Sequence, residues 1–219
     1  MRKELLMVLV MVVSACLFMA LSYNCVLAFG DDEVKKIKMD EGLFDEYYKL
    51  MQQCFKNAKF EGVVKQKING ADVESKYIAY SKDIDYKKIE ISSYGEKLSY
   101  VVTPDKVWYF YEKSNYVVYF ASKKNIAKHN SRVNFDMARQ DGKITKSVAD
   151  GQITYKITEY ENNTRQTFVF DEKTKQLKFQ TVESDSGEKM ETSYKLWEGQ
   201  TIAKDIFNYP ARAIEKCID

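Results

Sequence analysis

Few residues of this 219-residue chain are of a type and spacing that could carry catalysis. His129, the one histidine, lies in a polar stretch that indicates an exposed loop rather than a general base. Asp83 and Asp85 are close in sequence, but a hard cation needs more oxygen ligands than this pair supplies. The sequence has no glycine-rich phosphate loop. We therefore expect no metal, no cofactor and no enzymatic activity.

The four cysteines fall into two groups. Cys16 and Cys25 lie in the apolar N-terminal region, whereas Cys54 and Cys217 lie near the two ends of the remaining chain. In an exported protein the second pair could form one disulfide. The alternative is that Cys54 is a small buried hydrophobic residue and Cys217 is a free thiol on the C-terminal end.

Aromatic residues are unusually frequent, with 16 Tyr and 12 Phe. Trp108 and Phe110 could form a stacking platform for a nucleic acid or a sugar, or they could belong to a hydrophobic core. The formal net charge is only +2, which lacks the basic field of a nucleic-acid-binding protein. We therefore expect no nucleic-acid partner, and a core role for these aromatic residues.

The first 28 residues have the pattern of a signal peptide. Arg2 and Lys3 precede an apolar run over 5–21, and Val26-Leu27-Ala28 offers a cleavage site. Two other interpretations stay open: lipidation of Cys16, which follows Val13-Ser14-Ala15, and retention of the apolar run as a membrane anchor. All three interpretations predict that the rest of the chain works outside the cytoplasm.

The elements that follow predict one mainly β domain. After a flexible segment over 29–40, apolar residues at spacings of three and four predict an amphipathic helix from Glu41 to Ala58. Period-two alternation then predicts about ten short antiparallel strands, the last from Thr201 to Phe207. The stretch from Ser122 to Ala149 is expected to form a lid with short helices, one of them around Arg132–Arg139. The predicted units are therefore a signal peptide (1–28), the flexible segment, one domain (41–210) and a tail (211–219).

Two predicted strands are apolar on both faces. Val107-Trp108-Tyr109-Phe110-Tyr111 and Tyr116-Val117-Val118-Tyr119-Phe120 contain almost no polar residue. Such strands are covered on both sides, or contact an apolar ligand on one side. One amphipathic helix covers only one face of a sheet, so the other face needs a second cover or a ligand.

Two stretches resemble the outer-membrane lipoprotein carrier (LolA-like) family. The run from Lys97 to Tyr111 is similar to the strand–turn–strand of that family, in which a turn with Asp precedes an apolar-Trp-aromatic-Tyr run. The run from Thr167 to Pro210 is similar to its ending, with Leu177-Lys178-Phe179 and then Ile206-Phe207-Asn208-Tyr209-Pro210. The wider fold is similar to that of lipid-binding lipoproteins and envelope-stress sensors.

The resemblance implies a mainly β (α+β) fold: an antiparallel incomplete barrel, or half-barrel, closed over by helices. It also implies an apolar cavity for the acyl chains of lipoproteins or phospholipids, and partners among inner- and outer-membrane envelope proteins. The expected function is that of a periplasmic or envelope carrier without enzymatic activity; the alternative is a sensor on the same fold that binds a protein. The candidate cavity residues are Tyr77, Leu98, Tyr100, Val102, Trp108, Phe110, Tyr119, Ile153, Tyr155, Phe168 and Phe179. The face of each strand stays open, since a one-residue slip exchanges the two sets.

Overall fold

The computed structural model describes only part of the chain. The described residues are 40–68, 71–83, 86–93, 96–120, 123, 126, 142–159, 163–185, 188–196, 199, 201–208 and 213–217. The predictions of a signal peptide, of a lipidated Cys16 and of a short helix over 132–139 lie outside these residues.

The helix α2 (Glu41–Phe55) begins where the sequence predicts it. Asp40 is its N-cap, and its carboxylate oxygen accepts a hydrogen bond from the Leu43 amide at 3.0 Å. The helix ends three residues earlier than predicted, because Lys56 is extended and Ala58 already belongs to the first strand. Of the predicted apolar stripe, Tyr47, Leu50, Met51 and Cys54 are buried, whereas Ala58 lies in β1. Phe44 and Phe55 are the further buried residues of the helix.

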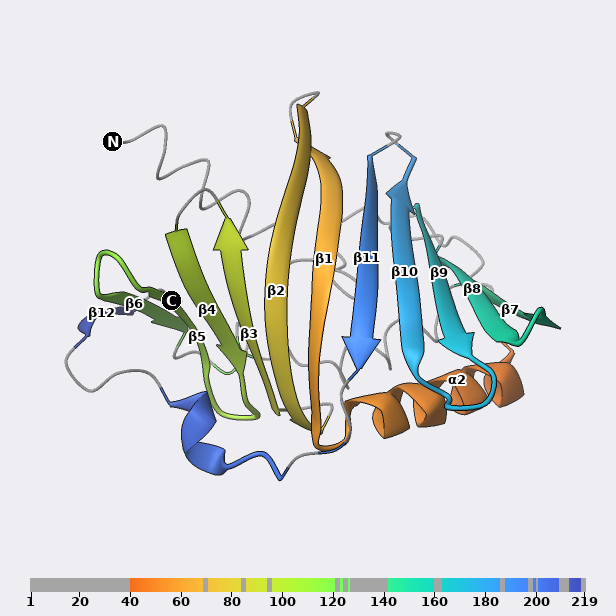
Figure 1. Ribbon diagram of the computed structural model, residues 1–219, viewed down its shortest axis with the longest axis horizontal. Helices are drawn as coiled ribbons and strands as arrows, with labels where there is room; N and C mark the ends of the chain where they lie inside the picture. The colour runs from red at the N-terminus through yellow and green to blue at the C-terminus, as the bar shows by residue number, and fades with distance from the viewer. Residues whose placement is uncertain are drawn as a thin grey trace, which may run out of the picture.

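Within the described residues, twelve strands form one continuous sheet, which Figure 1 shows from the face opposite α2. Their bounds are β1 (Ala58–Ile68), β2 (Ala71–Asp83), β3 (Tyr86–Ser93), β4 (Glu96–Val102), β5 (Val107–Tyr111), β6 (Tyr116–Phe120), β7 (Gly142–Ala149), β8 (Gln152–Glu159), β9 (Thr164–Asp171), β10 (Leu177–Ser184), β11 (Lys189–Leu196) and β12 (Ile214–Cys217). Their order is β12-β6-β5-β4-β3-β2-β1-β11-β10-β9-β8-β7. The sheet is therefore open between β12 and β7, and the predicted incomplete antiparallel barrel is confirmed.

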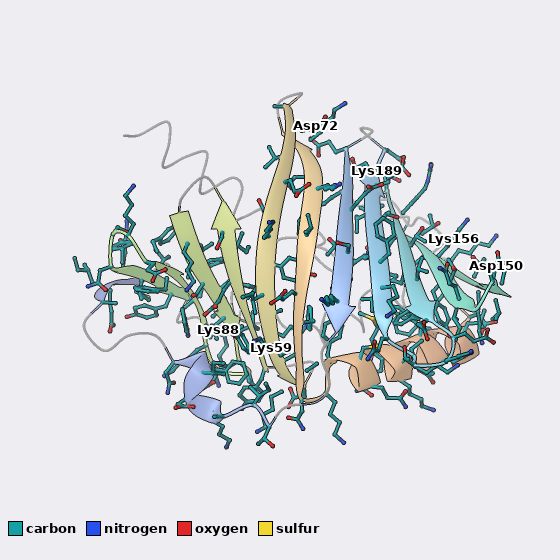
Figure 2. All side chains as sticks on the ribbon, viewed as in Figure 1. Lys59, Asp72, Lys88, Asp150, Lys156 and Lys189 are labelled. Carbon is teal, nitrogen blue, oxygen red and sulfur yellow. The ribbon has the colours of Figure 1, made fainter. Side chains whose placement is uncertain are left out.

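The two faces of the sheet have different covers. On one, which we call the helix face, α2 runs across the strand ends, and most of the buried residues of the chain form one core there. On the other, which we call the outer face, a smaller core forms where the C-terminal segment packs on β4, β5 and β6. The residues of this smaller core are Val101, Trp108, Val117, Ile202 and Phe207. The outer face also carries charged side chains: Lys59 and Lys88 lie beside this core, over the Tyr80 ring, and Lys156 lies towards the other end of the sheet (Figure 2).

Three elements differ from the sequence predictions. The last eight residues of the predicted lid form a strand, β7, which pairs with β8 along its whole length. The predicted last strand is instead a 3-10 helix, η1 (Lys204–Phe207). The predicted tail contains β12, which pairs with β6 in parallel. Since every residue of β12 is exposed, no buried side chain marks this strand in the sequence.

Candidate functional site

Seven of the predicted cavity residues lie together on the helix face. All seven are buried and belong to its one core: Tyr77, Leu98, Tyr100, Val102, Ile153, Tyr155 and Phe168. They come from β2, β4, β8 and β9, so the fold brings together residues that are up to 91 positions apart in sequence. The fold therefore places these seven candidates in one packed core on the helix face.

The other four candidates lie on the outer face, which corrects their assignment to the same cavity. Trp108, Phe110 and Tyr119 pack with the C-terminal segment, and the Trp108 indole N–H donates a hydrogen bond to the Phe207 carbonyl at 3.1 Å. Phe179 pairs in register with Ser193, whose neighbour Tyr194 belongs to the helix-face core. The outer-face apolar residues of β5 and β6 are thus covered by the chain itself.

An aromatic ladder crosses β4, β5 and β6 on the helix face. The rings of Tyr100 and Tyr109 stack with centroids 4.8 Å apart, and those of Tyr109 and Phe120 meet edge-on at 6.1 Å. Tyr100 is among the candidates predicted from the sequence, whereas Tyr109 and Phe120 are not. The signal that could have found them is spacing, because each lies two residues from another residue on the same face of its strand. Ile126 packs in the same core. Like the buried residues of α2, it contributes to this core from outside the sheet.

The helix α2 packs on the other half of this face. The Tyr47 ring contacts those of Tyr155 and Phe168, with centroids 5.4 and 5.0 Å away. Lys146 on β7 donates a hydrogen bond to Glu46 on α2 at 2.6 Å, and this bond lowers the pKa of the Glu46 carboxyl. These contacts hold α2 over β7, β8 and β9. At its C-terminal end, Phe55 reaches the Phe60 ring on β1, with centroids 5.4 Å apart, and the Lys87 ammonium on β3, 5.5 Å from its ring centroid. The aromatic ladder on β4, β5 and β6 lies at the other end of the sheet.

The two cysteines do not form the disulfide that the sequence left open. Cys54 is buried on α2, and its thiol donates a hydrogen bond to the Lys175 carbonyl at 2.9 Å. Burial raises the pKa of this thiol to about 11. Cys217 is exposed on β12, which lies at the far edge of the sheet. The alternative of a buried Cys54 and an exposed Cys217 thiol is the one found.

Buried polar side chains accompany the apolar ones between β8 and β11. Tyr194 donates a hydrogen bond to the Gln180 side-chain oxygen at 2.7 Å, and burial raises the pKa of its phenol. Gln166 donates one to the Glu159 carboxylate at 2.8 Å. The helix face therefore includes buried polar side chains over β8 to β11, whereas over β3 to β6 it is more uniformly apolar.

A glycine in the middle of the sheet accommodates Tyr77. The Tyr77 ring lies across Gly62, and its hydroxyl donates a hydrogen bond to the Ser193 carbonyl at 3.4 Å. A methyl group at Gly62 would overlap both the Tyr77 phenol and that carbonyl. Burial is also the main cause that raises the pKa of Tyr77, with the neighbouring Tyr194 adding to it.

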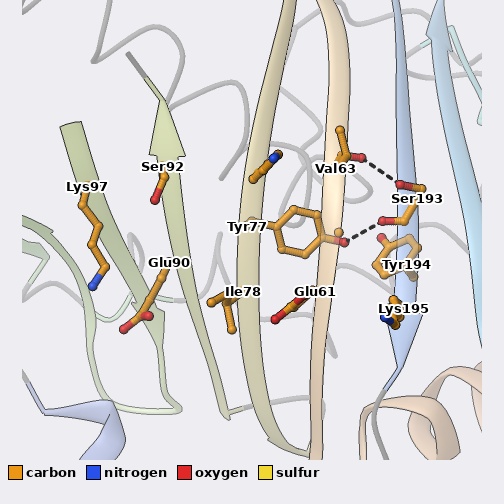
Figure 3. Close-up of a pocket in the computed structure, with 12 residues that line it drawn as sticks. Glu61, Val63, Tyr77, Ile78, Glu90, Ser92, Lys97, Ser193, Tyr194 and Lys195 are labelled. Carbon is orange, nitrogen blue, oxygen red and sulfur yellow. Dashed lines mark hydrogen bonds between the residues drawn. The ribbon is translucent and has the colours of Figure 1, made fainter. Parts of the chain in front are cut away.

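A pocket of about 600 Å³ lies against the outer face at this point (Figure 3). Such a volume is within the range of ligand pockets, roughly 300–1,000 Å³. Most of its lining side chains are on the outer face of β1, β2, β3, β4 and β11: Glu61, Val63, Lys76, Ile78, Glu90, Ser92, Lys97, Ser193 and Lys195. Gly62, Tyr77 and Tyr194 complete the lining. Of these twelve residues, only Tyr77 is among the cavity candidates predicted from the sequence, and the pocket on this face was not predicted.

The titratable residues considered for chemistry have structural roles where the structure describes them. The Asp83 carboxylate accepts a hydrogen bond from the Tyr86 amide at 3.1 Å and so stabilises the β2–β3 turn. His129 and Asp85 lie outside the described residues. Within the described part of the chain, no group of three or more His, Cys, Asp or Glu residues could hold a metal ion.

Solved structures similar to this chain share its fold. An uncharacterized conserved protein from Thermus thermophilus matches with a TM-score of 0.55 and 11% identity, over 80% of this chain and 98% of that protein. A LolA superfamily protein from Nitrosomonas europaea matches with a TM-score of 0.42 and 9% identity, over 75% of this chain and 97% of the other. The MucA/MucB complex of Pseudomonas aeruginosa matches with a TM-score of 0.42 and 11% identity, over 78% of this chain and 62% of the matched chain.

No family model and no curated protein matches the sequence. At 11% identity, the likeness to the Thermus thermophilus protein concerns the fold alone. The open sheet of the described residues is the half-barrel that the sequence resemblance predicted.

Proposed function

We propose that this protein is an exported carrier that binds acyl chains of lipoproteins or phospholipids on the helix face of its half-barrel. The observation that supports the proposal is the aromatic ladder of Tyr100, Tyr109 and Phe120, together with the aliphatic residues beside it on β3 and β4. The ladder strands β4, β5 and β6 lie beyond the strands that α2 contacts. Tyr100 and Tyr109 are buried in this structure, so an acyl chain would have to replace the contacts that bury them. It would then meet apolar side chains, and binding there needs no catalytic group.

The size of the surface is consistent with useful affinity. Burial of one methylene group contributes about 0.8 kcal/mol, so ten would contribute roughly 8 kcal/mol. Association and ordering oppose binding by several kcal/mol, and the contacts of Ile126 with this core must be exchanged for contacts with the ligand. The expected affinity for a single chain is therefore micromolar or weaker, which suits a carrier that must release its cargo.

Export is part of this proposal, supported by the signal-peptide pattern of residues 1–28. Among the helices that the structure describes, none is long and apolar enough to span a membrane. The proposed partners are the envelope proteins that would load and receive the cargo.

A fluorescent fatty-acid titration tests the binding site. Phe120 and Tyr119 are adjacent on β6, both half-buried, and lie on opposite faces of the sheet. We expect Phe120→Gln to weaken binding roughly 5–10-fold, since an aromatic contact contributes about 0.5–1.5 kcal/mol beyond its buried area. Tyr119→Gln, the matched control, should leave the affinity within about twofold because its ring faces away from the ladder. Equal effects of the two substitutions would contradict this placement.

The alternative is an envelope sensor that recognises a protein partner without carrying lipid. One observation favours it, namely the pocket on the outer face, whose lining includes five charged residues. A protein that takes up no fatty acid but binds a peptide at this pocket would support the sensor.

A further inference from the structure

The pocket on the outer face is built from two straight rows of side chains. In the first row, Lys97, Ser92, Lys76, Val63 and Ser193 are successive register partners on β4, β3, β2, β1 and β11. Neighbouring strands are about 4.8 Å apart, so this row is roughly 19 Å long. The second row, Glu90, Ile78, Glu61 and Lys195, runs beside it two residues further along each strand. The pocket is thus an elongated trough across five strands (Figure 3).

The rim of this trough is basic. Lys76, Lys97 and Lys195 are exposed, whereas the two glutamates of the second row are half-buried. Glu90 forms an ion pair with Lys88 at 2.8 Å, and both side chains are less than a fifth exposed. Glu61 is the direct register partner of Lys195. Lys97 also forms an ion pair with Glu112 at 3.7 Å. The three lysines and two glutamates of the lining carry a formal charge of +1, so the rim is weakly basic.

The floor of the trough is aliphatic but small. Val63 in the first row and Ile78 in the second are diagonal neighbours on β1 and β2, and both are half-buried. They offer contact for one or two aliphatic side chains. An acyl chain in this trough would keep much of its length in water, because only these two aliphatic side chains contribute to the floor. The charge and the small floor favour a peptide over a lipid.

We propose that this trough is a docking site for a segment of a partner protein that contains both acidic and aliphatic residues. The acidic side chains pair with Lys76, Lys97 and Lys195, and an aliphatic side chain contacts Val63 and Ile78. The site lies on the face opposite the proposed acyl-chain site, so a partner can dock while the carrier holds its cargo. It therefore gives the carrier a surface for the proteins that load or receive lipid.

Fluorescence anisotropy of the purified protein with a labelled peptide tests this site. The probe is a fluorescein-labelled peptide in which three leucines alternate with four glutamates. The two control peptides replace the leucines with serine, or the glutamates with lysine. The pocket variant combines Lys76→Glu, Lys97→Glu and Lys195→Glu. The matched control combines Lys143→Glu, Lys156→Glu and Lys178→Glu, which are exposed lysines outside the pocket with the same change of net charge. Ile78→Asn tests the floor separately.

We expect the pocket variant to weaken binding of the probe at least tenfold and the control variant less than twofold. Ile78→Asn and the serine peptide should each weaken it about threefold, whereas fatty-acid uptake should be unchanged in all variants. Absence of probe binding, or an equal loss in the two triple variants, would overturn the proposal. Flotation with phosphatidylglycerol vesicles is the second arm. Vesicle binding that the pocket variant alone abolishes, without peptide binding, would assign the trough to a membrane instead.

Discussion

At the scale of a single residue, Gly62 allows three neighbouring strands to make a close contact. Because it has no side chain, the Tyr77 ring can lie across β1 and reach the Ser193 carbonyl on β11. The same ring packs edge-on against Phe60 and Tyr194, with centroids 6.2 Å away from each. A glycine inside a strand commonly marks such a close approach.

We expect Gly62→Ala to destabilise the protein by about 1–3 kcal/mol, the usual cost of overpacking a filled core. The added methyl group overlaps a backbone carbonyl, which has less freedom to move than a side-chain end. Urea unfolding followed by circular dichroism measures the change. Gly199→Ala is the control, since its methyl group would make only an ordinary contact with the Asn57 carbonyl at 3.6 Å. A Gly62 variant as stable as this control would contradict the packing described here.

Among the elements, the C-terminal segment completes the outer face of β4, β5 and β6. Phe207 is buried against Trp108, and β12 adds a parallel strand beside β6. We expect Phe207→Ala to lower the free energy of unfolding by about 3–5 kcal/mol, as for other buried phenylalanines. The adjacent Ile206, half-buried, is the control, and Ile206→Ala should cost clearly less. Similar losses for both would show that the segment is not anchored through Phe207.

The ion pair between α2 and β7 makes a pH-dependent contribution. The pKa of Glu46 is lowered in the folded state, so this stabilisation is present above the unfolded pKa of about 4.3 and is lost as the pH falls through the folded value. We expect Glu46→Gln to cost about 0.5 kcal/mol at pH 7, because the pair is partly exposed, and progressively less below pH 4. Thermal unfolding at several pH values measures this. A loss independent of pH, or equal to that of Glu172→Gln on the β9–β10 turn, would exclude the pair as its cause.

The sequence predicted most elements, because α2 and most strands have clear periodicity. It missed β7, where only Gly142 and Ile144 are buried, and β12, whose residues are all exposed.

For the site, the sequence identified apolar residues but not their faces. Trp108 and Tyr100 look equivalent in the sequence, yet only the register places one under Phe207 and the other beside Tyr109. The trough was missed because its residues are ordinary solvent-facing positions until five strands align them.

At the scale of the whole molecule, the open sheet places the two proposed binding sites on opposite faces. The helix face holds the aromatic ladder proposed for acyl chains, with α2 fixed over the other end. The outer face holds the basic trough proposed for a partner, beside the region that the C-terminal segment covers. Cargo and partner can therefore bind at the same time, as a carrier that exchanges lipid between proteins requires.

Native mass spectrometry of the protein purified from the cell envelope, followed by organic extraction, is the most direct test of whether the protein carries acyl chains. We expect a bound phospholipid or acylated peptide, which is depleted in the Phe120→Gln variant and retained in the Tyr119→Gln variant. The mass of the protein itself also separates cleavage after Ala28 from a diacylglyceryl group on Cys16. A protein that is recovered empty and also takes up no fluorescent fatty acid would contradict the carrier function.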